Sequence, residues 1–204
     1  ISLYYDMPID GDVWLEDPLD SSYPPSIAFK AAQIQDDNKA ILFLREMREM
    51  VFLKKKNIAK WDNIALAGQI VGLNINQLKL DFEGKAISHF KDDLKLAKEL
   101  GVKGFPCLFF IDDAGNTEFV KGSKPYSFYE MTILKLNPSI VKTEYQKNWE
   151  ALFLKYNSWT AREFSELSGT PRSEIEKVLT ELSNNGNLEK LTTKNGAIWK
   201  LIKQ

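Results

Sequence analysis

The sequence contains one cysteine, Cys107, and one histidine, His89, among its 204 residues. A single cysteine cannot close a disulfide within the chain, and it cannot supply a cysteine-rich zinc site. A single histidine excludes the metal sites that use two histidines. The chain by itself therefore offers neither a disulfide framework nor a zinc centre of the common types, and we expect no bound metal.

Long hydrophobic runs and an excess of charge of one sign are also missing. The longest apolar stretch, residues 64–73, is interrupted by Gly68 and Gln69 and is much shorter than the roughly 20 residues of a membrane-spanning helix. Lysine and arginine number 27 against 28 aspartates and glutamates, which gives a net charge of −1. This balance creates no chain-wide positive field for nucleic acid or for an anionic membrane surface. We therefore expect neither as a partner.

A phosphate-binding glycine loop is absent as well. The two glycine-containing segments at residues 68–72 and 101–104 do not form G-x-G-x-x-G between a strand and a helix, which is the spacing that holds a dinucleotide. We therefore expect no cofactor in this chain.

The first hundred residues place apolar side chains at helical spacing. After an irregular segment at residues 7–25, the pattern predicts five helices, at about residues 26–35, 37–55, 62–71, 74–84 and 85–100. The pattern then changes to a continuous apolar run at residues 105–111, typical of a strand buried on both faces. A turn at residues 113–116, a returning strand at 117–120 and a helix at 126–136 complete this part.

The segment Asn137-Pro138-Ser139 marks a boundary, and a small module follows it. We expect helices at residues 144–155, 160–167 and 171–182, and then a two-stranded ribbon over 188–202 that turns at residues 194–196. This order is typical of a winged helix. The second helix of its helix-turn-helix carries three glutamates, whereas a helix that reads DNA is basic. We therefore expect the module to contact protein or to serve in packing, and not to bind DNA.

The most distinctive local feature is Gly101 to Leu108, where a helix end and a glycine-rich loop lead to a proline that opens a strand. The Phe105–Pro106 bond is either cis or a trans bond at a strand start, which is a permitted position for proline. Cys107, the next residue, is either a small buried apolar side chain or a reactive thiol.

Several segments of the chain together resemble the DsbA-like thioredoxin family, specifically its FrnE-like and Spx-adaptor (YjbH) branches. The matching segments span residues 12–136 and comprise residues 11–14, 20–24, 28–32, 44–49, 56–58, 92–93 with 97, 101–106, and 122 with 126. The C-terminal module, with Gly196 to Lys200 near its end, is similar to the tail of adaptor-type members. In thioredoxin-like folds the loop before the strand carries a cis-proline beside the redox-active Cys-x-x-Cys.

This resemblance implies an α/β, thioredoxin-like fold of the DsbA type that is incomplete at the N-terminus. It assigns residues 1–104 to the helical insertion, 105–137 to the strand–hairpin–helix part and 138–204 to a winged-helix-like module. In that family a first strand and the Cys-x-x-Cys helix precede the segment matching Met7. We therefore expect the Cys-x-x-Cys upstream of Ile1 and no catalytic residue within this chain.

Two functions follow from the resemblance. The first is a DsbA/FrnE-like thiol–disulfide oxidoreductase or isomerase, for which this chain supplies the cis-proline loop and a helical lid. The second is a non-enzymatic YjbH-like adaptor that binds a partner for proteolysis. A glutathione-dependent isomerase of the same superfamily fits less well, because those enzymes generally lack the C-terminal tail.

In either case the implied partner is a protein or peptide, carrying a thiol or disulfide if the chain serves an oxidoreductase. The expected substrate-binding residues are Phe105, Pro106, Cys107, Trp14, Tyr23 and Pro24. A single cysteine and the lack of a visible signal peptide favour a cytoplasmic location, and the periplasm stays open because the N-terminal part is expected to be missing.

Overall fold

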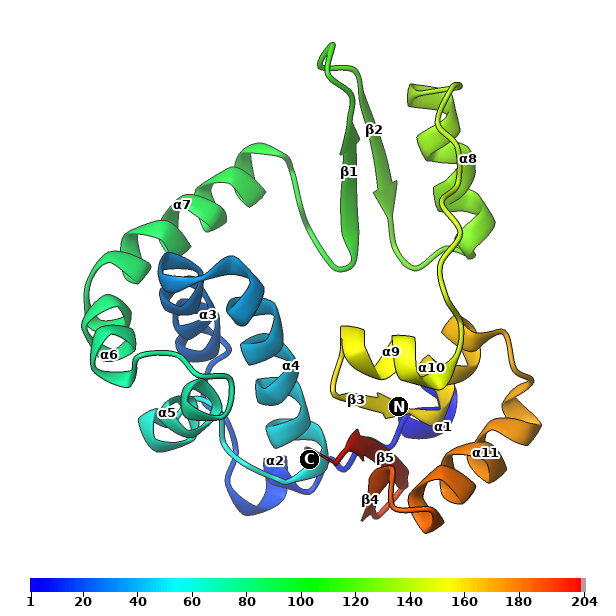
Figure 1. Cartoon of the computed structure of the whole chain (residues 1–204). Helices are drawn as coiled ribbons and strands as arrows, with labels where there is room; N and C mark the ends of the chain where they lie inside the picture. Colours follow the sequence, from blue (N-terminus) through cyan, green and yellow to red (C-terminus); the bar gives the residue numbers. More distant parts are fainter. Residues whose placement is uncertain (203–204) are drawn as a thin grey trace. The chain divides into compact units, whose positions relative to one another are not determined.

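The computed structural model describes residues 1–202 and forms two compact units (Figure 1). The first unit combines residues 1–90 with the chain from residue 146 onward, and the second comprises residues 91–145. The structure thus groups the C-terminal module with most of the helical segment. The domain boundaries predicted at residues 104 and 137 follow the resemblance to the family and not this packing, and they stay a prediction. Within the described residues, no helix has both the length and the apolar character needed to cross a membrane.

Seven helices make up the N-terminal half of the chain. They are α1 (Ser2–Tyr5), α2 (Val13–Glu16), α3 (Tyr23–Gln35), α4 (Asp37–Leu53), α5 (Trp61–Ile70), α6 (Ile75–Glu83) and α7 (Lys85–Glu99), the last of which continues into the second unit. Side-chain caps fix two of the starts, because Asp36 accepts from the amides of residues 38 and 39 and Asn74 accepts from that of Gln77. Helix α5 begins at Trp61, one residue before the predicted start, and Asp62 lies in its first turn.

The core of this helical part lies mainly between α3 and α4. Small side chains on α3, among them Ala28, Ala31 and Ala32, face larger ones of α4 such as Phe43 and Met47, and all of these are buried. A second close approach occurs where α5 meets α6. A Cβ atom added to Gly68 would lie 2.8 Å from Leu78 Cδ2, so a larger residue there would force the Leu78 side chain to move.

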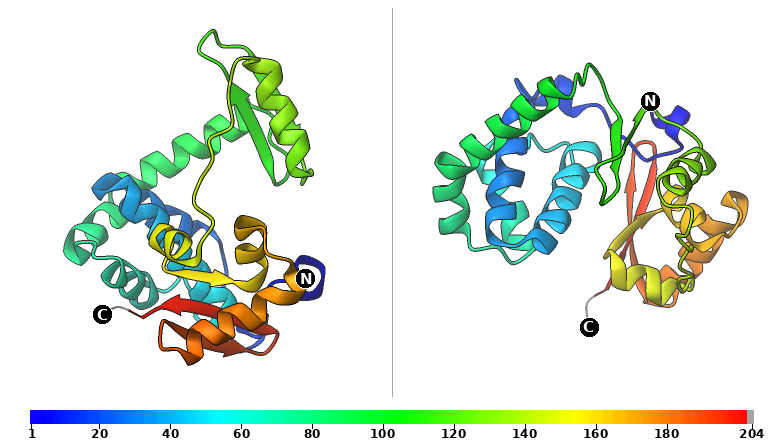
Figure 2. Two further views of the ribbon diagram at one scale, coloured as in Figure 1. Left: turned by 45° about the vertical axis from the view of Figure 1, so that its right-hand side comes forward. Right: turned by 90° about the horizontal axis from the view of Figure 1, so that it is seen from above.

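The C-terminal part of the first unit has a hydrophobic core of its own. Its elements are α9 (Trp149–Lys155), β3 (Ser158–Thr160), α10 (Ala161–Ser168), α11 (Arg172–Asn184), β4 (Leu188–Thr193) and β5 (Gly196–Leu201). The strands form an antiparallel sheet in the order β3-β5-β4, with Trp159 opposite Trp199. The red strands β4 and β5 lie beside the orange helix α11 (Figure 2).

Most of these C-terminal elements match the sequence prediction. The β4–β5 ribbon turns at the predicted residues, and Thr160 caps α10 through a capping box with Glu163. Helix α9 begins five residues later than predicted, because Asn148 caps it by accepting from the amide of Ala151 at 2.8 Å. Strand β3 was not predicted.

The second unit contains the end of α7, strands β1 (Cys107–Ile111) and β2 (Thr117–Lys121), and helix α8 (Tyr126–Leu136). The two strands pair antiparallel, and Phe109 stacks on Phe119 with ring centroids 4.7 Å apart. The prediction that β1 is buried on both faces is wrong for this structure. Four of its residues are half-buried and Ile111 is 66% exposed, since β2 is the strand that pairs with β1 within residues 1–202.

Candidate functional site

The predicted proline loop is a tight turn between α7 and β1. Gly101 has a φ of 68°, and the amide of Val102 donates to the carbonyl of Ala97 at 2.9 Å, which ends α7. The Phe105–Pro106 peptide bond is cis. The thiol of Cys107 donates to the carbonyl of Gly104 at 2.9 Å, and the amide of Gly122 donates to that of Pro106 at 2.8 Å.

Phe105 lies in this loop and is 91% exposed. An aromatic side chain in solvent is available to a partner, whereas Cys107 is half-buried and already hydrogen-bonded. The role of Phe105, Pro106 and Cys107 in substrate binding stays a prediction.

The other three predicted residues belong to the first unit. Trp14 is 45% exposed and packs on Phe52 at a centroid distance of 5.8 Å. Tyr23 is 53% exposed and meets Phe90 edge-on at 5.0 Å. Pro24 is half-buried in the first turn of α3. The role of Trp14, Tyr23 and Pro24 in substrate binding stays a prediction.

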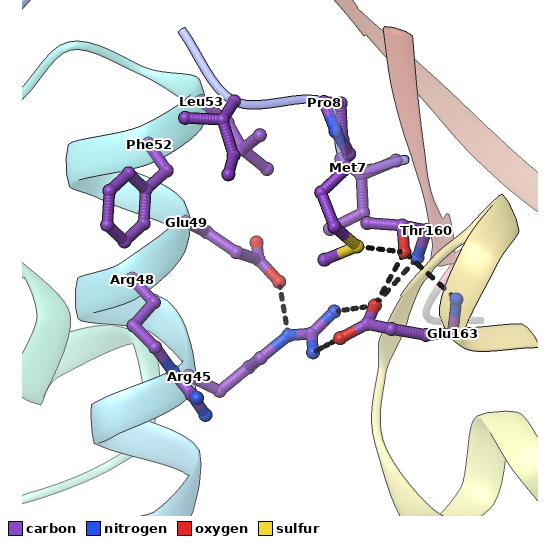
Figure 3. Close-up of a pocket in the computed structure, with 11 residues that line it drawn as sticks. Met7, Pro8, Arg45, Arg48, Glu49, Phe52, Leu53, Thr160 and Glu163 are labelled. Carbon is purple, nitrogen blue, oxygen red and sulfur yellow. Dashed lines mark hydrogen bonds and ion pairs between the residues drawn. The ribbon is translucent and has the colours of Figure 1, made fainter. Parts of the chain in front are cut away.

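Sequence reasoning missed the strongest electrostatic feature of the first unit, which is centred on Arg45 (Figure 3). This arginine of α4 binds Glu163 of α10 through two parallel contacts, Nη1 to Oε1 at 2.6 Å and Nη2 to Oε2 at 2.9 Å. Its Nε donates to Glu49 Oε1 at 3.1 Å, and Nη2 also donates to the carbonyl of Ser158 at 3.1 Å. A bidentate arginine–carboxylate pair is strong and directional, so Arg45 connects α4 to the C-terminal module.

Lys200 of β5 makes the second set of contacts. Its Nζ lies 2.6 Å from Glu49 Oε2 and 3.7 Å from Glu46 Oε2. Lys54 binds the other oxygen of Glu46 at 2.5 Å, and the hydroxyl of Ser158 donates to Glu49. We call Arg45, Glu46, Glu49, Glu163 and Lys200 the charged junction.

These contacts shift the pKa values of two carboxylates of the charged junction, Glu49 and Glu163. Burial raises the pKa of Glu49, but the hydrogen bonds from Lys200 and Ser158 and the charges of Lys200 and Arg45 outweigh it, so the pKa falls below its ordinary value. The pKa of Glu163 is also lowered, because Arg45 outweighs the effect of burial there. Each carboxylate is therefore held in its charged form.

The signal in the sequence was the spacing of Arg45 and Glu49, which lie four residues apart on a predicted helix. That spacing does not identify Glu163, which lies 118 residues further along the chain. The junction therefore depends on tertiary packing that periodicity alone does not reveal.

A third set of contacts holds residues 6–12, which run between α4 and the turn of the β4–β5 ribbon. Arg172 of α11 binds Asp6 at 2.6 and 3.0 Å, and Lys194 binds both oxygens of Asp12 at 2.8 Å. The side chain of Asn195 donates to the carbonyl of Ile9 at 2.7 Å. We call residues 6–12 the N-terminal strap. The strap therefore contacts the turn of the ribbon.

A cavity of about 200 Å³ lies between α4, the strap and the C-terminal module (Figure 3). Its apolar lining comes from residues of all three, namely Met7, Pro8, Ile9, Phe52, Leu53 and Ile198. Four charged side chains, Arg45, Arg48, Glu49 and Glu163, also line it. In the part of the chain that the structure describes, no group of three His, Cys, Asp or Glu side chains is placed to hold a metal ion.

Comparison with known proteins places the chain in a family. A family model described as thioredoxin matches residues 2–131. The chain therefore belongs to the thioredoxin family. The match to the family model ends before α9, so the C-terminal module is an addition to the part that defines the family.

The relatives narrow this assignment. The chain is 33% identical to the ClpXP adapter protein SpxH of Halalkalibacterium halodurans over 201 residues, which covers 97% of this chain and 66% of that protein. It is 29% identical to the protein of the same name from Bacillus subtilis, over 96% of this chain and 67% of the relative. The chain thus spans about two thirds of the length of these relatives.

A solved structure agrees on the fold. The cytosolic disulfide reductase DsbM from Pseudomonas aeruginosa matches 59% of this chain and 62% of its own with a TM-score of 0.51 and 23% identity. At this identity the likeness concerns the fold alone. The predicted DsbA-like, thioredoxin-like α/β fold and the resemblance to the Spx-adaptor branch are confirmed.

Proposed function

We propose that this chain serves a non-enzymatic adaptor, which binds a client protein of the Spx class and delivers it to the protease ClpXP. One observation carries this proposal. The thioredoxin model ends at residue 131, whereas the similarity to the ClpXP adapter proteins covers 97% of the chain. The C-terminal module is therefore shared with relatives named as adapters, and a function that needs only a thioredoxin fold leaves it unexplained.

The charged junction supports the same proposal. Arg45 and Lys200 connect α4 to the C-terminal module. The strap is connected to the same module through Arg172 and Lys194, which bind its aspartates. The helical part and the C-terminal module each have a hydrophobic core, and these ion pairs join the two parts. A binding protein can use the combined surface of both parts to hold one partner.

The oxidoreductase predicted from the sequence is the alternative function. Thiol–disulfide exchange by a Cys-x-x-Cys pair needs two thiols, and this chain carries one, Cys107. Such an enzyme would use a pair outside this sequence, with the proline loop as its substrate clamp. The cytoplasmic location predicted above is part of the adaptor proposal. Disulfides are rare in reducing compartments, and a chain with one cysteine forms none within itself.

A reconstituted degradation assay distinguishes the two functions. Purified ClpX, ClpP, ATP and Spx are incubated with and without the protein at its full natural length, and the loss of Spx is followed on gels. An adaptor increases the initial rate of Spx loss and leaves the rate for a ClpXP substrate that needs no adaptor unchanged.

The same preparation is tested for reduction of insulin disulfides by dithiothreitol. An unchanged rate of Spx loss, together with catalytic turnover in the insulin assay, would contradict the adaptor and support the oxidoreductase.

A further inference from the structure

The cavity beside the charged junction combines an apolar wall with Arg48, a cation that no described residue pairs with. We infer that it binds an extended segment of the client protein, in which one large apolar side chain stands next to an acidic residue. This inference deepens the proposed function, since it specifies the chemistry of the client segment that the adaptor holds.

The charges of the lining give the first argument. Arg45 is paired with Glu49 and Glu163, and Glu49 is further paired with Lys200. Arg48 is exposed and lines the same cavity, yet no described residue pairs with its guanidinium. Among residues 1–202, the lining carboxylates are thus neutralised from within, while Arg48 has no partner and can bind a carboxylate supplied from outside.

The apolar lining gives the second argument. Phe52 and Leu53 of α4 face Met7 and Pro8 of the strap across the opening (Figure 3). The space of about 200 Å³ is smaller than the roughly 300–1,000 Å³ of a typical site for a drug-sized molecule. It exceeds the roughly 150 Å³ of an engineered cavity that accepts benzene. One large aliphatic or aromatic side chain therefore suits it.

Helix spacing connects these two features. Arg48 and Phe52 are four residues apart on α4 and so share one face of the helix. The ring of Trp14 packs on Phe52 and is 45% exposed, which extends the apolar surface beyond the cavity. An extended peptide that inserts one side chain beside Phe52 can place a neighbouring carboxylate near Arg48.

The first experiment uses short peptides and does not depend on any client. Acetyl-Gly-Glu-Leu-Glu-Gly amide is titrated into the ¹⁵N-labelled protein, with versions that replace both glutamates by lysine or the leucine by glycine as controls. We expect saturable amide shifts at residues 7–9 and 48–53 with the first peptide alone. Equal shifts with the lysine peptide, or no localised shift, would overturn the inference.

The second experiment tests Arg48 directly. The variant Arg48→Glu is compared with Arg162→Glu, which reverses an exposed arginine of α10 that pairs with Glu166 and does not line the cavity. We expect Arg48→Glu to weaken peptide binding roughly tenfold, because reversal replaces attraction by repulsion. The control should remain within about twofold. Circular dichroism verifies that both variants are folded.

The same variants separate this inference from the proposed function. If wild-type protein accelerates Spx loss and Arg48→Glu does so equally well with unchanged Spx affinity, the adaptor function holds and the cavity is not the client site. If the acidic peptide binds as expected but Spx degradation is not accelerated, the cavity binds its peptide and the adaptor proposal fails.

Discussion

Replacing Arg45 by methionine tests the charged junction most severely. Methionine keeps most of the side-chain volume and removes the guanidinium that binds Glu49 and Glu163. The side chains of Arg45 and Glu49 are only 17% and 4% exposed, so the loss leaves carboxylates with little access to water.

The magnitude follows from how many partners remain. Removing one member of a buried ion pair typically costs about 3–5 kcal/mol. Glu49 keeps Lys200 at 2.6 Å and Glu163 keeps its hydrogen bonds with Thr160, so neither carboxylate is fully orphaned. We therefore expect the free energy of unfolding to fall by about 2–4 kcal/mol.

Urea denaturation followed by tryptophan fluorescence and circular dichroism measures this change. Arg162→Met is the matched control, because it removes an exposed pair four residues apart on α10 and should cost less than about 0.5 kcal/mol. The double variant Arg45→Met/Glu163→Gln should cost less than the sum of its single variants. Equal midpoints for Arg45→Met and Arg162→Met would refute the role assigned to the junction.

Three further predictions concern acidity, packing and the strap. Because the pKa values of Glu49 and Glu163 are lowered on folding, their stabilisation is complete above the unfolded value of about 4.3 and is lost as the pH falls through the lowered values. The loss of stability between pH 6 and pH 3, measured by urea melts, should be smaller in Glu163→Gln, and an equal loss would contradict this reasoning. Gly68→Ala places a Cβ 2.8 Å from Leu78 Cδ2 and should cost about 1–3 kcal/mol in thermal unfolding; an unchanged melting temperature would show that the α5–α6 contact relaxes freely. Asp6→Asn removes the charge that Arg172 binds, so hydrogen exchange at residues 6–12 should accelerate, and exchange equal to wild type would mean that this ion pair does not hold the strap.

Local patterns were sufficient to predict the elements whose causes are local. The periodic apolar residues predicted the long helices, Asn74 and Thr160 marked two starts, and the residues before Gly196 marked the ribbon turn. Each of these depends on residues only a few positions apart, so the sequence alone contains the signal.

Long-range features could not be predicted in this way. Strand β3 has three residues, too few to show a period, and it exists because it pairs with β5 about forty residues later. The apolar run at residues 105–111 predicted full burial, yet burial depends on which elements cover a strand. Arg45 and Glu163 belong to different parts of the chain, and only their packing brings them together.

The most direct test of the adaptor is the rate at which ClpXP degrades Spx in the presence of a cysteine-free variant. In this variant of the protein at its full natural length, Cys107 and every other cysteine are replaced by serine. Binding of a client requires no thiol chemistry, so the account predicts a rate of Spx loss equal to that with wild-type protein. A fall to the rate measured without any adaptor, in a variant that remains folded, would contradict the account and favour a thiol–disulfide mechanism.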